Sequence, residues 1–204
     1  GLDRFLERYA VIVMSDHGQT AVRDVARLAD RFSHVPQVLV AASNRAAHLY
    51  RLDAGAPAPR ALAERLDGEP SIEVALFAED GATVARRDGA ELVLRDSDDG
   101  VELDGDAAIL DHPDAVERAL GAVRCPNAGE VVVSAVDGWE FADLGGRHHL
   151  GGGSHGSLTS GDSLVPVLTV GLSGPSPGRV VDVAPAVLAH FGVAAAGYVL
   201  DRAA

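Results

Sequence analysis

The chain of 204 residues is short of cysteine and of long apolar runs. Its one cysteine, Cys125, has no partner for an intrachain disulfide or for a cysteine metal site, so we interpret it as an incidental loop thiol. No apolar run approaches the roughly 20 residues that a membrane helix needs. The first residues, 1–4, lack the basic start and apolar core of a signal peptide. We therefore expect a soluble chain with no membrane segment and favour a cytoplasmic location; export stays open, because any signal would lie upstream of Gly1.

Positive charge is also scarce. The chain has 17 basic and 30 acidic residues, which give a formal net charge of −13. A surface of this sign repels the phosphates of nucleic acids and of anionic lipids unless a bound cation reverses the local charge. We therefore expect no binding to nucleic-acid duplexes.

The apolar pattern predicts an α/β chain with a hairpin-rich middle. We expect helices over residues 2–9, 22–32, 60–66, 114–123 and 183–191, and strands over residues 10–14, 37–42, 45–52, 130–135 and 164–170, the first and the last two of them buried. Between residues 71 and 103, short apolar segments alternate with acidic Gly-containing turns, which is typical of hairpins. This pattern predicts a core over 1–42, an insertion or cap over 43–128, and a return to the core over 129–204.

Polar residues replace apolar ones abruptly where the first expected strand ends, at Asp16 and His17. Ligands of open α/β sheets bind beyond the carboxyl ends of strands, and Gly18 permits a turn that brings a carboxylate and an imidazole to one ion. An oxygen and a nitrogen ligand suit Zn²⁺, Mn²⁺ or Fe better than Ca²⁺. An Asp that caps the turn beside an exposed His is an equal alternative on these residues alone.

A Gly-rich connection over residues 138–161 contains three more histidines. Connections of this length are usually functional when they occur in a compact domain. His155 lies between glycines and is the one side chain of residues 151–156 that can bind a metal firmly, so we take it as a candidate ligand. His148 and His149 are weaker candidates, because their spacing to His155 matches no ligand pattern.

Several motifs resemble the alkaline phosphatase superfamily, most closely its type I phosphodiesterase/nucleotide pyrophosphatase branch. Residues 11–18 are similar to the strand and S-D-H-G motif of that family. Residues 153–157 followed by 164–168 resemble its G-x-H-G loop and V-P strand, and 181–185 resemble its final D-x-x-P helix start. The resemblance extends in order over residues 2–192 and is weak only in the middle.

This resemblance implies an α/β fold with an alkaline-phosphatase-like core sheet flanked by helices and interrupted by a small hairpin-rich cap. It implies a metal-dependent phosphoric ester hydrolase of the phosphodiesterase/nucleotide pyrophosphatase type. Asp16 and His17 would hold one divalent metal ion and His155 would help to hold a second, with Zn²⁺ expected first and Mn²⁺ or Fe as alternatives. Two cations clamp phosphoryl oxygens and supply the positive charge that a small phosphorylated substrate needs on an acidic protein.

The chain departs from the family pattern at its beginning. The family's nucleophile, its first metal-binding Asp and an Asp/His pair all precede S-D-H-G by a long stretch, and only fifteen residues precede Asp16. We therefore expect the carboxyl-terminal part of such an enzyme, without the first strands of its sheet, with half of the metal ligands and no turnover alone. We expect no catalytic residue in this chain, with the nucleophile upstream of Gly1, and rate Ser15, Ser154 and Ser157 as poor nucleophiles.

Other interpretations stay open. The motifs also fit a sulfatase, a phosphonate hydrolase or a phosphoglycerate mutase, because these branches differ chiefly in the nucleophile and the cap. From a different class, the chain is also compatible with a metal-binding remnant that has no catalysis. The sequence predicts neither the substrate-binding residues nor the oligomeric state.

Overall fold

The computed structural model describes residues 1–194, which divide into two compact units. Unit 1 comprises residues 1–16 together with the chain from residue 165 onward, and unit 2 comprises residues 17–164. The division into a core over 1–42, a cap over 43–128 and a core over 129–204 stays a prediction.

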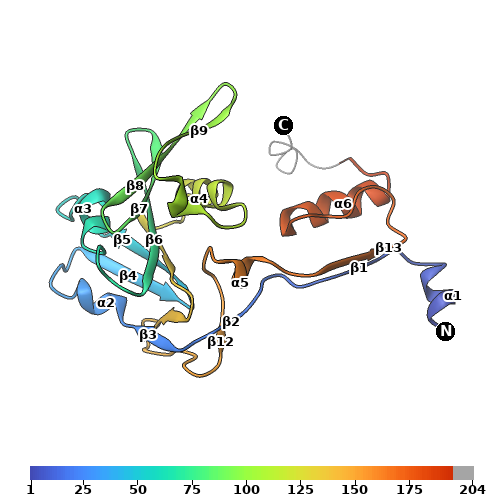
Figure 1. Cartoon of the computed structure of the whole chain (residues 1–204), viewed down its shortest axis with the longest axis horizontal. Helices are drawn as coiled ribbons and strands as arrows, with labels where there is room; N and C mark the ends of the chain where they lie inside the picture. Colours follow the sequence, from blue (N-terminus) through green and yellow to red (C-terminus); the bar gives the residue numbers. More distant parts are fainter. Residues whose placement is uncertain (195–204) are drawn as a thin grey trace. The chain divides into compact units, whose positions relative to one another are not determined.

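Unit 2 contains a seven-stranded antiparallel sheet in the order β4-β5-β10-β6-β7-β8-β9 (Figure 1). Its strands are β4 (Val38–Ser43), β5 (Ala46–Arg51), β6 (Ile72–Glu79), β7 (Ala82–Arg87), β8 (Ala90–Ser97), β9 (Gly100–Gly105) and β10 (Val131–Ala135). The strands β6 to β9 pair in chain order, which confirms the hairpins expected between residues 71 and 103. Strand β10 is the last of the seven in the sequence, but it lies inside the sheet and pairs with β5 on one side and β6 on the other.

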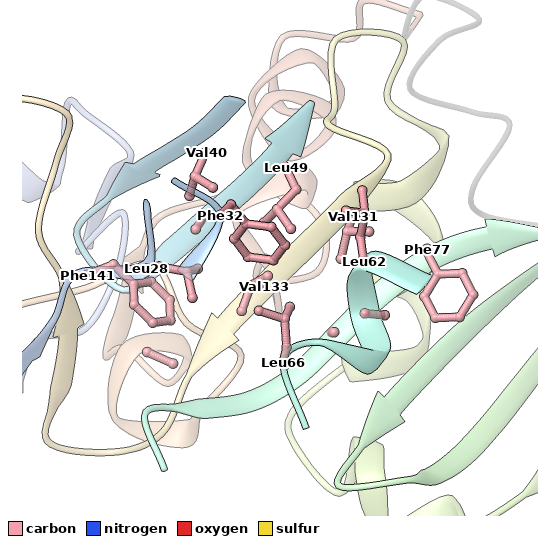
Figure 2. Close-up of a cluster of buried hydrophobic side chains, with 14 of the residues drawn as sticks. Leu28, Phe32, Val40, Leu49, Leu62, Leu66, Phe77, Val131, Val133 and Phe141 are labelled. Carbon is pink, nitrogen blue, oxygen red and sulfur yellow. The ribbon is translucent and has the colours of Figure 1, made fainter. Parts of the chain in front are cut away.

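A buried apolar cluster covers each face of this sheet. Successive side chains of a strand point to opposite faces, so neighbouring residues of β10 belong to different clusters. On one face, Val131 and Val133 belong to a buried cluster with residues of the helices α2 (Leu28–Arg31) and α3 (Pro59–Glu64). Figure 2 shows part of this cluster, with Leu62 of α3 beside Val131. On the other face, Val132 belongs to a second cluster with the 3-10 helix η1 (Ala107–Leu110) and the helix α4 (Ala115–Arg124).

Two short strand pairs and one short helix complete unit 2. Strand β2 (Thr20–Ala21) is antiparallel to β12 (Gly153–Ser154), and β3 (Asp24–Ala26) is parallel to β11 (Trp139–Phe141). Helix α5 (Ser160–Ser163) ends the Gly-rich stretch.

The helix expected over residues 22–32 is wrong in its first half, because residues 24–26 form strand β3 and only Leu28–Arg31 are helical. Val25 lies opposite Glu140 in the pair with β11, so tertiary pairing overrides the helical spacing of the apolar residues.

Unit 1 contains the helix α1 (Leu2–Leu6), the antiparallel pair of β1 (Val11–Met14) with β13 (Val167–Val170), the 3-10 helix η2 (Val180–Asp182) and the helix α6 (Val183–His190). The buried strands expected over 10–14 and 164–170 form, but burial is wrong: Val13 is 56% exposed and its partner Leu168 is 65% exposed. None of the buried hydrophobic residues of the described chain lies in unit 1, because its two-stranded ladder has no further strands to form a covered sheet. In residues 1–194 no helix combines the length and the apolar character that a membrane span requires.

Candidate metal centre

The structure brings His17 and His155 together. Their imidazole rings stack with centroids 3.6 Å apart and planes inclined by 13°. The pairing of β2 with β12 explains this contact, because Thr20 lies opposite Ser154 and the two histidines lie just outside the paired residues. Two sequence-distant imidazoles therefore form one cluster in unit 2, which we call the histidine pair.

Hydrogen bonds fix the chemical form of each ring. The Nδ1 atom of His17 lies 2.8 Å from the carbonyl oxygen of Gly18. A carbonyl only accepts, so Nδ1 carries the proton and the neutral ring has its lone pair on Nε2. The Nε2 atom of His155 lies 3.2 Å from the amide nitrogen of Asn44, which donates to it. The lone pair of His155 Nε2 accepts this bond, so the Asn44 amide would have to release that atom before it could bind a metal ion.

Gly18 is required by a close approach of two loops. Its backbone N–H donates to the carbonyl oxygen of Asp162 at 2.7 Å. A Cβ atom at residue 18 would lie 2.0 Å from the carbonyl oxygen of Gly161, which no side chain tolerates. The need for glycine after His17 is therefore one of space, whereas the sequence had indicated only freedom to turn.

A buried ion pair lies next to the histidine pair. The Nη1 atom of Arg45 donates to Oδ1 of Asp162 at 2.6 Å, and both side chains are almost fully excluded from solvent. The backbone N–H of Arg45 also donates to the carbonyl oxygen of His155 at 3.0 Å. The ion pair thus joins the turn between β4 and β5 to both histidine loops.

Arg118 of α4 supports the same loop from another side. Its guanidinium donates to the carbonyl oxygens of Ser157 and Leu158 and, at 2.7 Å, to the hydroxyl of Ser163. Burial lowers the pKa of Arg118, while the nearby Asp114 and Asp162 charges act in the opposite direction. Helix α4 therefore anchors the segment that follows His155.

A second buried carboxylate, Glu140 of β11, holds the Gly-rich loop ahead of His155. It accepts from the backbone N–H and the Nδ1 atom of His149 at 2.5 and 2.6 Å, and from the hydroxyl of Ser154 at 2.8 Å. Burial opposes ionisation of this carboxyl, but the hydrogen bonds from His149 and Ser154 outweigh it and lower the pKa of Glu140 below its ordinary value. His149 consequently has a structural partner, outside the histidine pair.

No protein-family model matches the sequence, and no curated protein matches it. Among solved structures, the chain is similar to phosphonoacetate hydrolase from Sinorhizobium meliloti 1021, a member of the alkaline phosphatase superfamily that was crystallised with phosphonoformate. The two share 16% sequence identity and a TM-score of 0.56, over 95% of this chain and 43% of that chain. The chain has an alkaline-phosphatase-like fold. The predicted fold class is therefore confirmed. The chain spans less than half the length of that hydrolase.

Within this alkaline-phosphatase-like fold, the predicted site residues fall into two groups. The structure places His17 with His155, whereas Asp16 is the last residue of unit 1 and its role as a ligand stays a prediction. His148 is exposed and accepts from the backbone N–H of Leu150. His149 binds Glu140.

The three serines rated as poor nucleophiles also have definite places. The hydroxyl of Ser154 donates to Glu140, and that of Ser157 donates to Asp162 at 2.8 Å. Both side chains are buried, so each hydroxyl has a structural use. Ser15 lies in unit 1, directly after β1.

Four residues that sequence reasoning did not single out for a role at the site surround the histidine pair: Asn44, Arg45, Glu140 and Asp162. For Asn44 and Arg45 the sequence shows only their place between two expected apolar strands; the burial of Arg45, and hence its need for a partner, comes from the structure. Nothing in the local sequence marks Glu140 or Asp162, because their partners lie in other segments.

The histidine pair fits part of a metal centre. A neutral imidazole can offer one nitrogen ligand, and a zinc ion takes four ligands in most sites. At His155 that nitrogen is the one that accepts from Asn44. Across residues 1–194, no three or more His, Cys, Asp or Glu side chains are arranged to hold an ion. The metal-ligand roles of His17 and His155 therefore stay a prediction, and a complete centre would need further ligands.

Proposed function

We propose that the chain supplies part of the two-metal site of a hydrolase that acts on a small phosphate or phosphonate substrate. The observation that carries this proposal is the stacked His17 and His155 pair in an alkaline-phosphatase-like fold. Asp16 and His17 would hold one ion and His155 would help to hold the other. The solved neighbour favours phosphonate hydrolysis, because it is a phosphonoacetate hydrolase bound to phosphonoformate. Phosphodiester hydrolysis is the second candidate, favoured by the S-D-H-G motif at residues 15–18.

Two features support the idea that this chain works as part of a larger protein. It spans 43% of the neighbour, and the described residues complete no metal centre. Unit 1 has no buried hydrophobic residue in its described part, while Phe5, Val13 and Leu168 are among its exposed apolar side chains. Further strands beside β1 and β13 would cover such side chains and supply the missing ligands and the nucleophile.

The chemistry follows from what the chain's own residues can do. The divalent ions would act as Lewis acids that polarise the phosphoryl oxygens and lower the pKa of a nucleophile. The carbonyl oxygen of Gly18 holds Nδ1 of His17, which restrains the imidazole ring and leaves Nε2 as the nitrogen that would bind an ion. Arg45 holds the carbonyl oxygen of His155, which fixes the start of that ligand's loop. Neutral imidazoles would add no negative charge to the ions. The site would therefore stay positive and attract an anionic substrate to an acidic chain.

Calorimetric titration of the metal-free chain with Zn²⁺ tests the ligand assignment. We expect His17→Ala and His155→Ala each to lower the Zn²⁺ affinity at least tenfold, in line with the loss of one ligand from a partial site. His148→Ala is the matched control, because His148 lies in the same Gly-rich stretch and outside the histidine pair. Equal Zn²⁺ affinity in the His17 and His155 variants would contradict the site.

Hydrolysis assays separate the two candidate functions. Phosphonoacetate and bis(p-nitrophenyl) phosphate are offered to the longest product of the gene and, in parallel, to the 204-residue chain. We expect turnover only by the longer product, with preference for phosphonoacetate if the phosphonate branch is right and for the diester if the phosphodiesterase branch is right. Turnover by the 204 residues alone would refute the claim that the chain lacks part of the site.

A further inference from the structure

We propose that Asp162 and Arg45 form a buried positioning pair that fixes the His17 loop against the His155 loop, and that Asn44 sets the orientation of the His155 ring. The three residues would not touch substrate; they act through the two histidines. This inference rests on the proposed function, since it assigns the residues that hold its ligands in place.

Asp162 joins three segments of unit 2. Its Oδ1 atom accepts from the hydroxyl of Thr20 at 2.6 Å and from Arg45 at 2.6 Å. Its Oδ2 atom accepts from the backbone N–H and the hydroxyl of Ser157 at 2.9 and 2.8 Å, and its carbonyl oxygen accepts from Gly18. Thr20 and Gly18 belong to the His17 loop, and Ser157 belongs to the His155 loop. Both loops are therefore tied to one carboxylate group and its backbone.

Arg45 completes the link from the sheet. Its side chain is 0% exposed, and every guanidinium nitrogen has an acceptor. Nε donates to the carbonyl oxygen of Trp139, Nη1 to Asp162, and Nη2 to the carbonyl oxygen of Val136 and to Asp137. A buried cation is stable only with such partners, so the group is held in one place. Because its backbone N–H binds the carbonyl oxygen of His155, this fixed residue also fixes that loop.

Asn44 acts on the ring itself. It occupies the left-handed region at φ 56°, which Asn tolerates better than most residues, in the turn between β4 and β5. Its carbonyl oxygen accepts from the backbone N–H of Phe141 at 2.8 Å, so the turn is anchored to β11. From this position the side-chain amide reaches Nε2 of His155. In the metal-free chain Asn44 therefore selects the tautomer in which Nε2 accepts a hydrogen bond, and its amide would give up that bond to an ion.

The first test uses nuclear magnetic resonance of the metal-free chain with isotope-labelled histidine, at an alkaline pH where the rings are neutral. In the unaltered chain we expect a nuclear Overhauser effect between the His17 and His155 rings and a single His155 tautomer protonated at Nδ1. Asn44→Ala should give a mixture of tautomers at His155. Asp162→Asn should remove the ring-to-ring effect, because the amide has only one acceptor oxygen in place of the two carboxylate oxygens that bind Arg45, Thr20 and Ser157.

Milder variants keep the test decisive if Asp162→Asn does not fold. Thr20→Val removes one hydrogen bond to Asp162 and keeps the side-chain shape, so we expect a weakened ring-to-ring effect. Thr20→Ser keeps the hydroxyl and should restore it. Glu79→Gln is the matched control: Glu79 of β6 pairs with Arg60 of α3, and loss of this pair should leave both histidine signals unchanged.

A Zn²⁺ titration of the same variants supplies the second readout. We expect Asp162→Asn to lower the Zn²⁺ affinity about 10–100-fold, as for other residues that orient metal ligands, with a smaller loss in Thr20→Val. Failure of the unaltered chain to bind Zn²⁺ would overturn the proposed metal site, while the ring signals would still decide the positioning role. Unchanged ring signals in both Thr20→Val and Asn44→Ala would overturn the positioning role, whatever the metal does.

Discussion

Asp162 and Glu140 are the buried acidic residues of the described chain, and they differ in the partner that neutralises them. Asp162 pairs with the guanidinium of Arg45. Glu140 pairs with the imidazole of His149 and also accepts from the hydroxyl of Ser154. Two separate carboxylates therefore hold the link between the histidine loops and the Gly-rich stretch ahead of His155.

The lowered pKa of Glu140 predicts a loss of stability in acid. A carboxyl whose folded-state pKa is depressed stabilises the fold above its unfolded pKa, about 4.3 for Glu, and this contribution is lost as the pH falls through the folded value. We expect the free energy of unfolding to fall below about pH 4.5, and Glu140→Gln to reduce this dependence. Urea unfolding at a series of acidic pH values measures how the free energy of unfolding depends on pH. Glu102→Gln, at an exposed residue of β9, is the control. Identical pH dependence in the unaltered chain and in Glu140→Gln would contradict the prediction.

The close approach at Gly18 predicts a large effect from one methyl group. A Cβ atom at this residue would collide with the backbone of Gly161, which has no flexible end to move away. We expect Gly18→Ala to lower the free energy of unfolding by about 2 kcal/mol or more. Gly178→Ala is the control, since its Cβ would meet only Asp182 Oδ2, at 3.7 Å. Equal stability of the two variants in urea would contradict the predicted collision at Gly18.

At the scale of single elements, strand β10 shows how the sheet supports the site. All five of its residues are buried, so its apolar side chains serve both faces of the sheet. Its one polar side chain, Ser134, accepts from the backbone N–H of Leu158 at 2.9 Å. The central strand thus provides core on both sides and also holds the loop that follows His155.

Helix α3 packs on one face of the sheet, and its contribution to the stability of unit 2 can be measured. Leu62 is fully buried among the residues of that face, including Val131 and Phe77. We expect Leu62→Ala to lower the free energy of unfolding by about 2–5 kcal/mol, from lost burial and the cavity left behind. Leu52→Ala, at a residue that is 60% exposed, should change it by less than about 0.5 kcal/mol. Similar urea midpoints for both variants would show that α3 does not pack as the structure has it.

Elements were predictable where their signal is local. The β-branched run at residues 130–135 and the acidic Gly-containing turns after residues 79 and 87 determine a strand and two hairpins without reference to the rest of the chain. The apolar spacing at 22–32 was misleading, because Val25 pairs with a strand that lies far away in sequence. The burial of β1 was misjudged for a related reason, since a β-branched run does not reveal how many strands lie beside it.

For the candidate site, the sequence indicated two residues that the structure brings together, and their role as ligands stays a prediction. A strand end and a Gly-rich loop mark His17 and His155, and the structure brings the two together. The ion pair of Arg45 with Asp162 could not be read from the sequence, because 117 positions separate the two residues and each has an ordinary local setting. This part of the site depends on contacts between residues that are far apart in the sequence.

At the scale of the whole molecule, the two units differ in what holds them together. Unit 2 contains all the buried hydrophobic residues of the described chain, and unit 1 contains a two-stranded ladder without a core. Isolated two-stranded pairs are marginal in water. The units should therefore differ in resistance to local opening.

Hydrogen exchange measures this difference. We expect backbone amides of β10 to exchange only on global unfolding of unit 2, and amides of β1 and β13 to exchange far faster through local opening. Peptides covering residues 131–135 and 11–14 give the comparison by mass spectrometry. Equal protection of the two would mean that unit 1 is stabilised by something other than its own ladder. The amides of β9, an exposed edge strand, provide a reference within unit 2.

The order of strands in the sheet has a consequence for synthesis on the ribosome. The strands β4 and β5 and the strands β6 to β9 can pair as their residues emerge, but β10 must arrive before the two groups join. Strands β2 and β12 enclose this whole sheet in sequence, so the histidine pair can form only after residue 155 has left the ribosome. The proposed two-metal site needs both histidines, so it would be complete only after the sheet has formed, and metal loading would follow folding of unit 2.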